Sequence, residues 1–96
     1  MEINVDAEGF LVNRDDWSED VGRELANRDG EEATDQIMTY INTARAIYEK
    51  EGTVPPIRKF AKAMGVTSKD LYDTFHKGPM KIICKWGGLP KPTGCV

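Results

Sequence analysis

The chain has 96 residues, 40% of them hydrophobic and 30% charged, and its formal net charge is −3 at pH 7. This length predicts one domain with a modest core, and the composition excludes an intrinsically disordered protein. The acidic balance disfavours a protein whose main partner is nucleic acid. No apolar run approaches the roughly 18 residues that a membrane-spanning helix needs.

The first residues, MEINVDAEGF, are acidic and lack the apolar segment of a secretion signal. We therefore expect a cytoplasmic protein. In that compartment a lasting structural disulfide is disfavoured, and a pair of cysteines is more often catalytic, redox-active or metal-binding.

Residues 3–12 predict a β-hairpin. Asp6 and Gly9 are turn residues, and the strand character on either side comes from Ile3, Val5, Phe10 and Val12. A lone two-stranded hairpin is marginal in water, so we expect it to lie against helices.

A first helix is predicted to start at Asp16. Asp16 and Glu19 match a capping box, in which the aspartate caps the helix and the glutamate is its third residue. Apolar residues then recur at every fourth position, at Trp17, Val21 and Leu25. Arg28-Asp29-Gly30 ends this helix.

The longest helical pattern lies in the middle of the chain and predicts the central helix. Its apolar residues share one helix face: Ile37, Tyr40, Ile41, Ala44, Ile47 and Tyr48. Gly52 ends the pattern.

Three shorter helices are expected after it. Pro55-Pro56 opens the third helix and Gly65 ends it, Thr67 or Ser68 caps the fourth, and Gly78-Pro79 starts the fifth. Their inward residues are Ile57, Phe60, Ala61 and Met64 in the third, Leu71, Tyr72 and Phe75 in the fourth, and Met80, Ile83 and Cys84 in the fifth.

The last ten residues have no apolar period, and their glycines and prolines favour neither helix nor strand. We expect a compact helical domain over 1–86 and a flexible arm over 87–96 that carries Cys95. The predicted fold class is mainly α (α+β): a small N-terminal β-hairpin packed on a bundle of about five helices, with a helix-turn-helix-like pair and a flexible C-terminal arm.

The third and fourth helices also match a helix-turn-helix at Ala61, Gly65 and Leu71. Four basic residues nearby are placed to meet phosphates: Arg58, Lys59, Lys62 and Lys69. Any two helices joined by a tight turn show this spacing, and Asp70 and Asp73 on the would-be recognition helix would repel phosphate. A DNA-binding regulator is therefore the alternative from another functional class.

A metal site would have to combine Cys84, Cys95 and His76, whose spacing matches no compact zinc pattern. We expect no metal and no cofactor. No carboxylate pair stands out as an acid and base, so the sequence leaves open whether the protein is an enzyme and favours a carrier or co-substrate.

The two cysteines are the strongest candidates for chemistry. Cys84 taken alone reads as a small buried residue, whereas Cys95 follows glycine and proline and has no core to fill. Eleven residue steps separate them and span at most about 36 Å, so the arm can fold back to bring the sulfurs together. One thiolate would then take up sulfur and the other would attack to release it.

Four basic residues are the candidates for binding substrate or partner. Lys81 and Lys85 flank Cys84, and Lys91 lies within the arm. Positive charge nearby favours a thiolate, so these lysines would help either sulfur react. The fourth residue is Arg58, which follows the paired proline.

Several segments resemble the DsrC/TusE family of sulfur-carrier proteins. The tail IICKWGGLPKPTGCV is similar to the family's carboxy-terminal arm, and EGTVPPIRKFAKAMG to its segment with paired proline and a following arginine. LYDTFHKGPMKIICKWGGLPKP and DAEGFLVNRDDWSEDV resemble the stretch before the arm and the opening of the chain. The resemblance covers roughly 3–28 and 50–96, and the loop MGVTSKD is shorter than in the family.

The resemblance implies a role for each thiol. TusE-like members, which relay sulfur to tRNA thiolation, keep only the penultimate cysteine, whereas the DsrC branch, the gamma subunit of dissimilatory sulfite reductase, has both. By that mapping Cys95 bears the sulfur and Cys84 resolves it.

The family also implies partners. Its arm inserts into the sulfite reductase formed by alpha and beta subunits, sulfur ends bridged between the cysteines as a trisulfide, and a membrane reductase complex or sulfurtransferases exchange that sulfur. We therefore predict a sulfur carrier of dissimilatory sulfur metabolism, with a TusE-like tRNA-thiolation relay as the alternative within the family.

Overall fold

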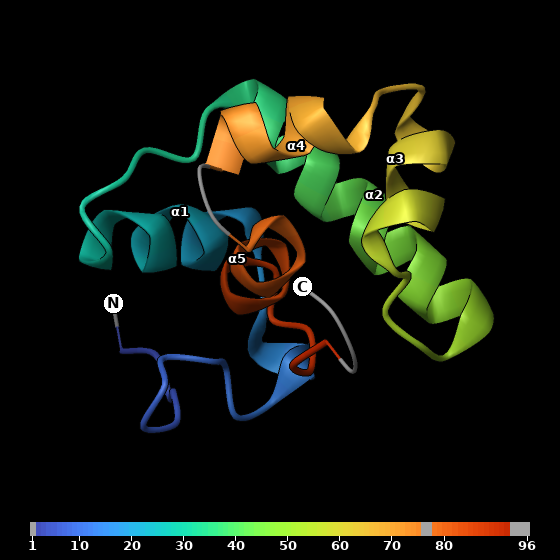
Figure 1. The fold of residues 1–96 in the computed structure, drawn as a ribbon. Coiled ribbons are helices and arrows are strands. Elements are labelled where there is room, and N and C mark those ends of the chain that lie inside the picture. The colour runs from blue at the N-terminus through green and yellow to red at the C-terminus, as the bar shows by residue number, and fades with distance from the viewer. Residues whose placement is uncertain (1, 76–77, 93–96) are drawn as a thin grey trace.

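Helix α5 lies at the centre of the molecule and contacts three other helices, α1, α2 and α4 (Figure 1). The computed structural model describes residues 2–75 and 78–92. Its helices are α1 (Glu19–Arg28), α2 (Asp35–Glu51), α3 (Ile57–Met64), α4 (Ser68–Phe75) and α5 (Pro79–Trp86), preceded by the 3-10 helix η1 (Arg14–Asp16). The expected mainly helical architecture with five helices is confirmed.

The ends of the helices follow from local chemistry. The Thr34 hydroxyl accepts a hydrogen bond from the Ile37 amide at 3.3 Å, and Gly52 ends α2 in a left-handed conformation at φ 75°. At the start of α4, Thr67 and Asp70 form a reciprocal capping box, each side chain accepting from the other's amide at 3.1 and 3.0 Å. These signals are local, so the sequence predicted the end of α2, both ends of α3 and the starts of α4 and α5.

The predicted β-hairpin is wrong. Within the described residues the N-terminal segment contains no strand, only one isolated antiparallel bridge between Val5 and Leu11. The Asp6 carboxylate accepts hydrogen bonds from the amides of Glu8 and Phe10, which fixes a tight turn. The Asn13 side chain then caps η1, so the chain leaves the pairing after one bridge.

The first helix starts two residues later than predicted. Ser18, not Asp16, caps α1, because its hydroxyl accepts from the Val21 amide at 3.2 Å. Asp16 instead belongs to η1, and Trp17 lies between the two helices.

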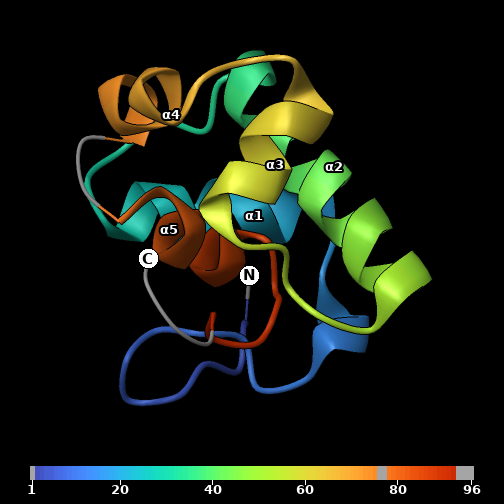
Figure 2. The same ribbon diagram turned by 45° about the vertical axis from the view of Figure 1, so that its right-hand side comes forward.

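The core joins all five helices and the N-terminal turn. Tyr40 packs against Phe60 and Phe75 with ring centroids 6.1 and 5.8 Å apart, and Phe75 packs against Trp86 at 6.4 Å. Figure 2 shows the N-terminal segment and the last described residues running close together below α5. The two ends of the described chain therefore meet on the side where α5 stops.

Candidate functional site

Cys84 lies in the last turn of α5 and its side chain is completely buried. Met80 and Ile83 are buried on the same helix, which confirms the predicted inward face. Burial raises the pKa of the Cys84 thiol to about 12. In this conformation the thiol is therefore protonated at neutral pH and is out of reach of a sulfur donor.

The chain folds back on α5 directly after it ends. The Gly87 amide donates to the Ile83 carbonyl at 2.8 Å, and the Leu89 amide donates to the Cys84 carbonyl at 3.0 Å. Gly88 has φ 66°, the left-handed conformation that this helix ending requires. Leu89 is 2% exposed, so residues 87–89 pack into the core and chain exposure begins at Pro90. The predicted boundary between domain and arm at residue 87 stays a prediction.

Two side chains from distant parts of the chain hold the same helix end. The Trp17 indole N–H donates to the Trp86 carbonyl at 2.8 Å, and the Arg45 guanidinium donates to the Gly87 carbonyl at 2.5 Å. The Arg45 guanidinium also lies 4.1 Å from the centroid of the Trp17 ring. Sequence reasoning missed this arrangement, which we call the Arg45–Trp17 clamp.

A glycine allows α1 to approach the clamp. A Cβ atom at Gly22 would lie 3.0 Å from the Trp86 carbonyl oxygen and 3.2 Å from the indole nitrogen of Trp17. Any larger residue at this position would separate α1 from the end of α5.

Lys85 and Lys81 lie on α5 beside Cys84, but their environments differ. Lys85 forms an ion pair with Asp29 at 2.9 Å, and the same carboxylate accepts from the Trp86 indole at 2.9 Å. Burial raises the pKa of Asp29, but the hydrogen bonds from Trp86 and Lys85 outweigh it and leave the pKa below its ordinary value. Lys81 is exposed and lines a shallow groove of about 340 Å³ with Lys85 and Ile82.

Lys91 anchors the start of the arm to the N-terminal turn. Its ammonium group pairs with the Glu8 carboxylate, lies 3.9 Å from Asp6 and sits 5.5 Å from the centroid of the Phe10 ring. The hydrogen bond to Glu8 raises the pKa of Lys91. Lys85 also packs against Gly9 of the N-terminal turn. Lys91 and Lys85 therefore lie near the same turn.

The remaining predicted residues lie elsewhere. Arg58 is exposed on α3, a helix that packs on α2 and α4, so it lies on a different element from Lys81 and Lys85. Cys95 and His76 lie outside the described residues.

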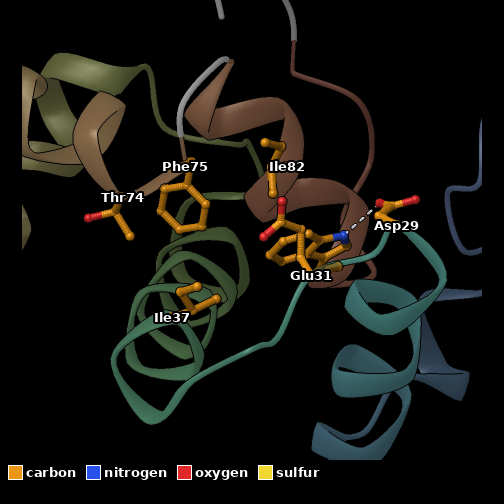
Figure 3. Close-up of a pocket in the computed structure, with 7 residues that line it drawn as sticks. Asp29, Glu31, Ile37, Thr74, Phe75 and Ile82 are labelled. Carbon is orange, nitrogen blue, oxygen red and sulfur yellow. Dashed lines mark hydrogen bonds between the residues drawn. The ribbon is translucent and has the colours of Figure 1, made fainter.

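The best-formed pocket was not predicted. It has a volume of about 250 Å³ and lies between α2, α4, α5 and the α1–α2 connection (Figure 3). Ile37, Phe75 and Ile82 line its apolar part, and Asp29 and Glu31 lie at its edge. None of the predicted site residues that the structure describes lines it. Its lining comes from four separate segments, so no local sequence pattern predicts it.

No helix in the part of the chain that the structure describes is both long and apolar enough to span a membrane.

Comparison with known proteins places the chain in a family. The family model described as "DsrC like protein" matches residues 1–96. The sulfurtransferase TusE of Yersinia pseudotuberculosis is 39% identical over 98% of this chain and 94% of its own length. The gamma subunit of dissimilatory-type sulfite reductase from Nitratidesulfovibrio vulgaris is 37% identical over 98% of this chain and 90% of its own.

A solved structure agrees with the sequence match. The NMR structure of DsrC from Allochromatium vinosum superposes with a TM-score of 0.87 at 40% identity and covers 98% of this chain and 90% of its own. The sequence and the fold therefore give the same answer, and the chain belongs to the DsrC-like family.

Proposed function

We propose that the protein is a sulfur carrier that takes up sulfur on Cys95 and resolves it with Cys84. The position of Cys84 carries this proposal. It is buried in the helix turn from which the segment bearing Cys95 departs, and the Leu89 amide is bonded to its carbonyl. Six residue steps lead from Leu89 to Cys95 and reach at most about 21 Å, so the second thiol is tethered within range of the first.

Loading is a thiol exchange. The Cys95 thiolate attacks the outer sulfur of a donor persulfide, a new S–S bond forms at Cys95, and the donor leaves as a thiolate. Cys84 does not compete, because its thiol is buried and its pKa is about 12.

Resolution uses the second thiol. The Cys84 thiolate attacks the inner sulfur of the Cys95 persulfide, a Cys84–Cys95 disulfide forms, and hydrogen sulfide leaves with the proton that Cys84 releases. Where sulfite reductase supplies the sulfur, the atom stays between the cysteines as a trisulfide, and a membrane reductase complex provides the electrons that restore both thiols. Such a cycle needs a compartment that keeps thiols reduced, so we propose a cytoplasmic location.

Mass spectrometry of the intact protein tests these roles. After incubation with glutathione persulfide, we expect the parent chain and Cys84→Ala to gain about 32 Da, the mass of one sulfur, and Cys95→Ala to gain nothing. Only the parent is expected to proceed to the internal bridge. An adduct that persists in Cys95→Ala and disappears in Cys84→Ala would reverse the two roles.

A TusE-like relay in tRNA thiolation is the second candidate. The 39% identity to a TusE protein favours it as strongly as the 37% identity to a sulfite reductase gamma subunit favours the first. The presence of Cys84 weighs towards the two-cysteine function, because a relay that passes sulfur on from one thiol has no step for a second.

A further inference from the structure

The contacts around the end of α5 suggest what keeps Cys84 out of reach. Trp86, Gly87, Gly88 and Leu89 are all buried, and Leu89 is bonded back to the Cys84 carbonyl. The Cys84 side chain is fully buried, so a reagent reaches its sulfur only through a local opening of the fold, and residues 86–89 are the buried segment next to it in the chain.

The Arg45–Trp17 clamp opposes that movement. It occupies the carbonyl groups of Trp86 and Gly87, two of the helix-end acceptors that no intrahelical partner can satisfy. Trp17 also packs on the next residue, because a Cβ atom at Gly88 would lie 2.9 Å from the Trp17 ring. Burial lowers the pKa of Arg45, and the charge of Arg14 adds to this effect. The guanidinium is thus partly removed from water, where its hydrogen bond to a carbonyl is stronger than on the surface.

We propose that Arg45 is a positioning residue that, together with Trp17, shields Cys84 and so directs incoming sulfur to Cys95. This inference deepens the proposed function and rests on it for the identity of the sulfur chemistry. The shielding itself requires only that the clamp hold residues 86–89 on the core.

The first test measures how fast Cys84 reacts in a Cys95→Ser chain, where it is the only thiol. Iodoacetamide is added at pH 8 without denaturant, and the alkylated fraction is followed by intact-protein mass spectrometry. We expect Arg45→Gln to be alkylated about tenfold faster than its parent, because loss of one charge-assisted hydrogen bond favours local opening to that extent. Trp17→Phe keeps a ring beneath Arg45 but removes the indole donor, and we expect an increase of about threefold.

Arg23→Gln is the matched control. Arg23 also donates from its guanidinium to a backbone carbonyl, that of Ala33 at 2.6 Å, but it lies at the α1–α2 connection. We expect its alkylation rate to equal that of the parent. An equal acceleration in Arg23→Gln, or an unchanged rate in Arg45→Gln, would overturn the proposal. If Arg45→Gln does not fold, an unchanged rate in Trp17→Phe overturns it.

A second measurement asks where sulfur is loaded. Chains with both cysteines are exposed briefly to glutathione persulfide, and the modified thiol is located by peptide mass spectrometry. We expect sulfur only on Cys95 in the parent and Arg23→Gln, and on both thiols in Arg45→Gln. A parent and an Arg45→Gln chain with the same distribution would contradict the directing role. Absence of sulfur from every variant would contradict the proposed function instead, while the alkylation result would still decide the shielding.

Discussion

At the scale of single residues, the surroundings of Cys84 decide how reactive its thiol is. Cys84 is placed in the core by the helical spacing that also buries Met80 and Ile83. A small apolar-like side chain suits that position, so the interpretation of Cys84 as a core residue is confirmed, while its role in resolving sulfur stays a prediction. Under the proposed shielding, Cys84 reacts only in a conformation in which the chain opens at the end of α5.

This burial predicts a particular pH dependence of stability. The pKa of Cys84 is raised from an ordinary value of 9.0 to about 12. The contribution of the neutral, buried thiol to the free energy of unfolding is therefore fully present below about pH 9. Above pH 9 the unfolded chain loses the proton and the folded chain keeps it. The free energy of unfolding should then fall by up to about 1.4 kcal/mol per pH unit as the pH rises towards 12.

Urea unfolding between pH 8 and 10.5 measures this slope. The comparison is between Cys95→Ser and the double variant Cys84→Ala/Cys95→Ser, because lysines and tyrosines titrate in both and cancel in the difference. Identical pH dependence in the two chains would mean that Cys84 ionises without unfolding.

At the scale of elements, the stability of α5 depends more on the contacts at its end than on its length. The helix has eight residues, too few to be stable alone, and its last carbonyls are bound by Gly87, Leu89, Trp17 and Arg45. Residues 87–89 therefore act as part of the helix's tertiary support, although their composition suggested a free arm.

Truncation of the chain tests this boundary. A chain that ends at Pro90 keeps Leu89 and both backbone hydrogen bonds and should unfold at nearly the same urea concentration as the full chain. A chain that ends at Trp86 loses the burial of Leu89, worth about 2 kcal/mol, together with the hydrogen bonds, so it should be destabilised by about 3 kcal/mol or more. Equal stability of the two truncated chains would show that residues 87–89 do not support the fold.

At the scale of the whole molecule, the question is which partner exchanges sulfur with the protein. We expect the purified protein to co-elute with dissimilatory sulfite reductase and to act as its co-substrate. Cys84→Ala should then reduce bridged product to background, because the bridge needs two sulfurs. The measurement is sulfite turnover with the alpha and beta subunits, followed by mass spectrometry of the carrier.

A TusE-like relay would transfer sulfur without Cys84, whereas the sulfite reductase co-substrate needs it. In a reconstituted tRNA-thiolation system, full sulfur transfer by Cys84→Ala together with no binding to sulfite reductase would establish the TusE-like function. Cys95→Ala is the matched control in both systems and should be inactive in each.

The parts of this molecule that the sequence predicted are those with local signals. The stripe from Ile37 to Tyr48, stopped at Gly52, and the cap expected at Thr67 or Ser68 predicted the right helices because each signal is local in the sequence. The sequence reading missed the Asn13 cap of η1, which follows the single bridge, and chose Asp16 over Ser18 as the cap of α1.

No local sequence signal predicts the Arg45–Trp17 clamp. Its hydrogen bonds join residues 69 and 42 positions apart, Trp17 to Trp86 and Arg45 to Gly87. The burial of Leu89 was not predicted for the same reason, since one apolar residue among glycines and prolines shows no periodic pattern. Only tertiary packing identifies these contacts, and they are the ones that the proposed shielding of Cys84 depends on.

The Arg45–Trp17 clamp also allows the intrinsic fluorescence of the protein to report on the end of α5. The chain has only two tryptophans, and both lie at the end of α5: Trp86 ends the helix, and Trp17 donates a hydrogen bond to its carbonyl group. The guanidinium over one indole and the carboxylate at the other place charged groups directly against both fluorophores. The intrinsic tryptophan fluorescence of the unlabelled protein therefore reports whether the end of α5 is open or closed. A stopped-flow fluorescence trace can follow this opening in real time while sulfur is exchanged.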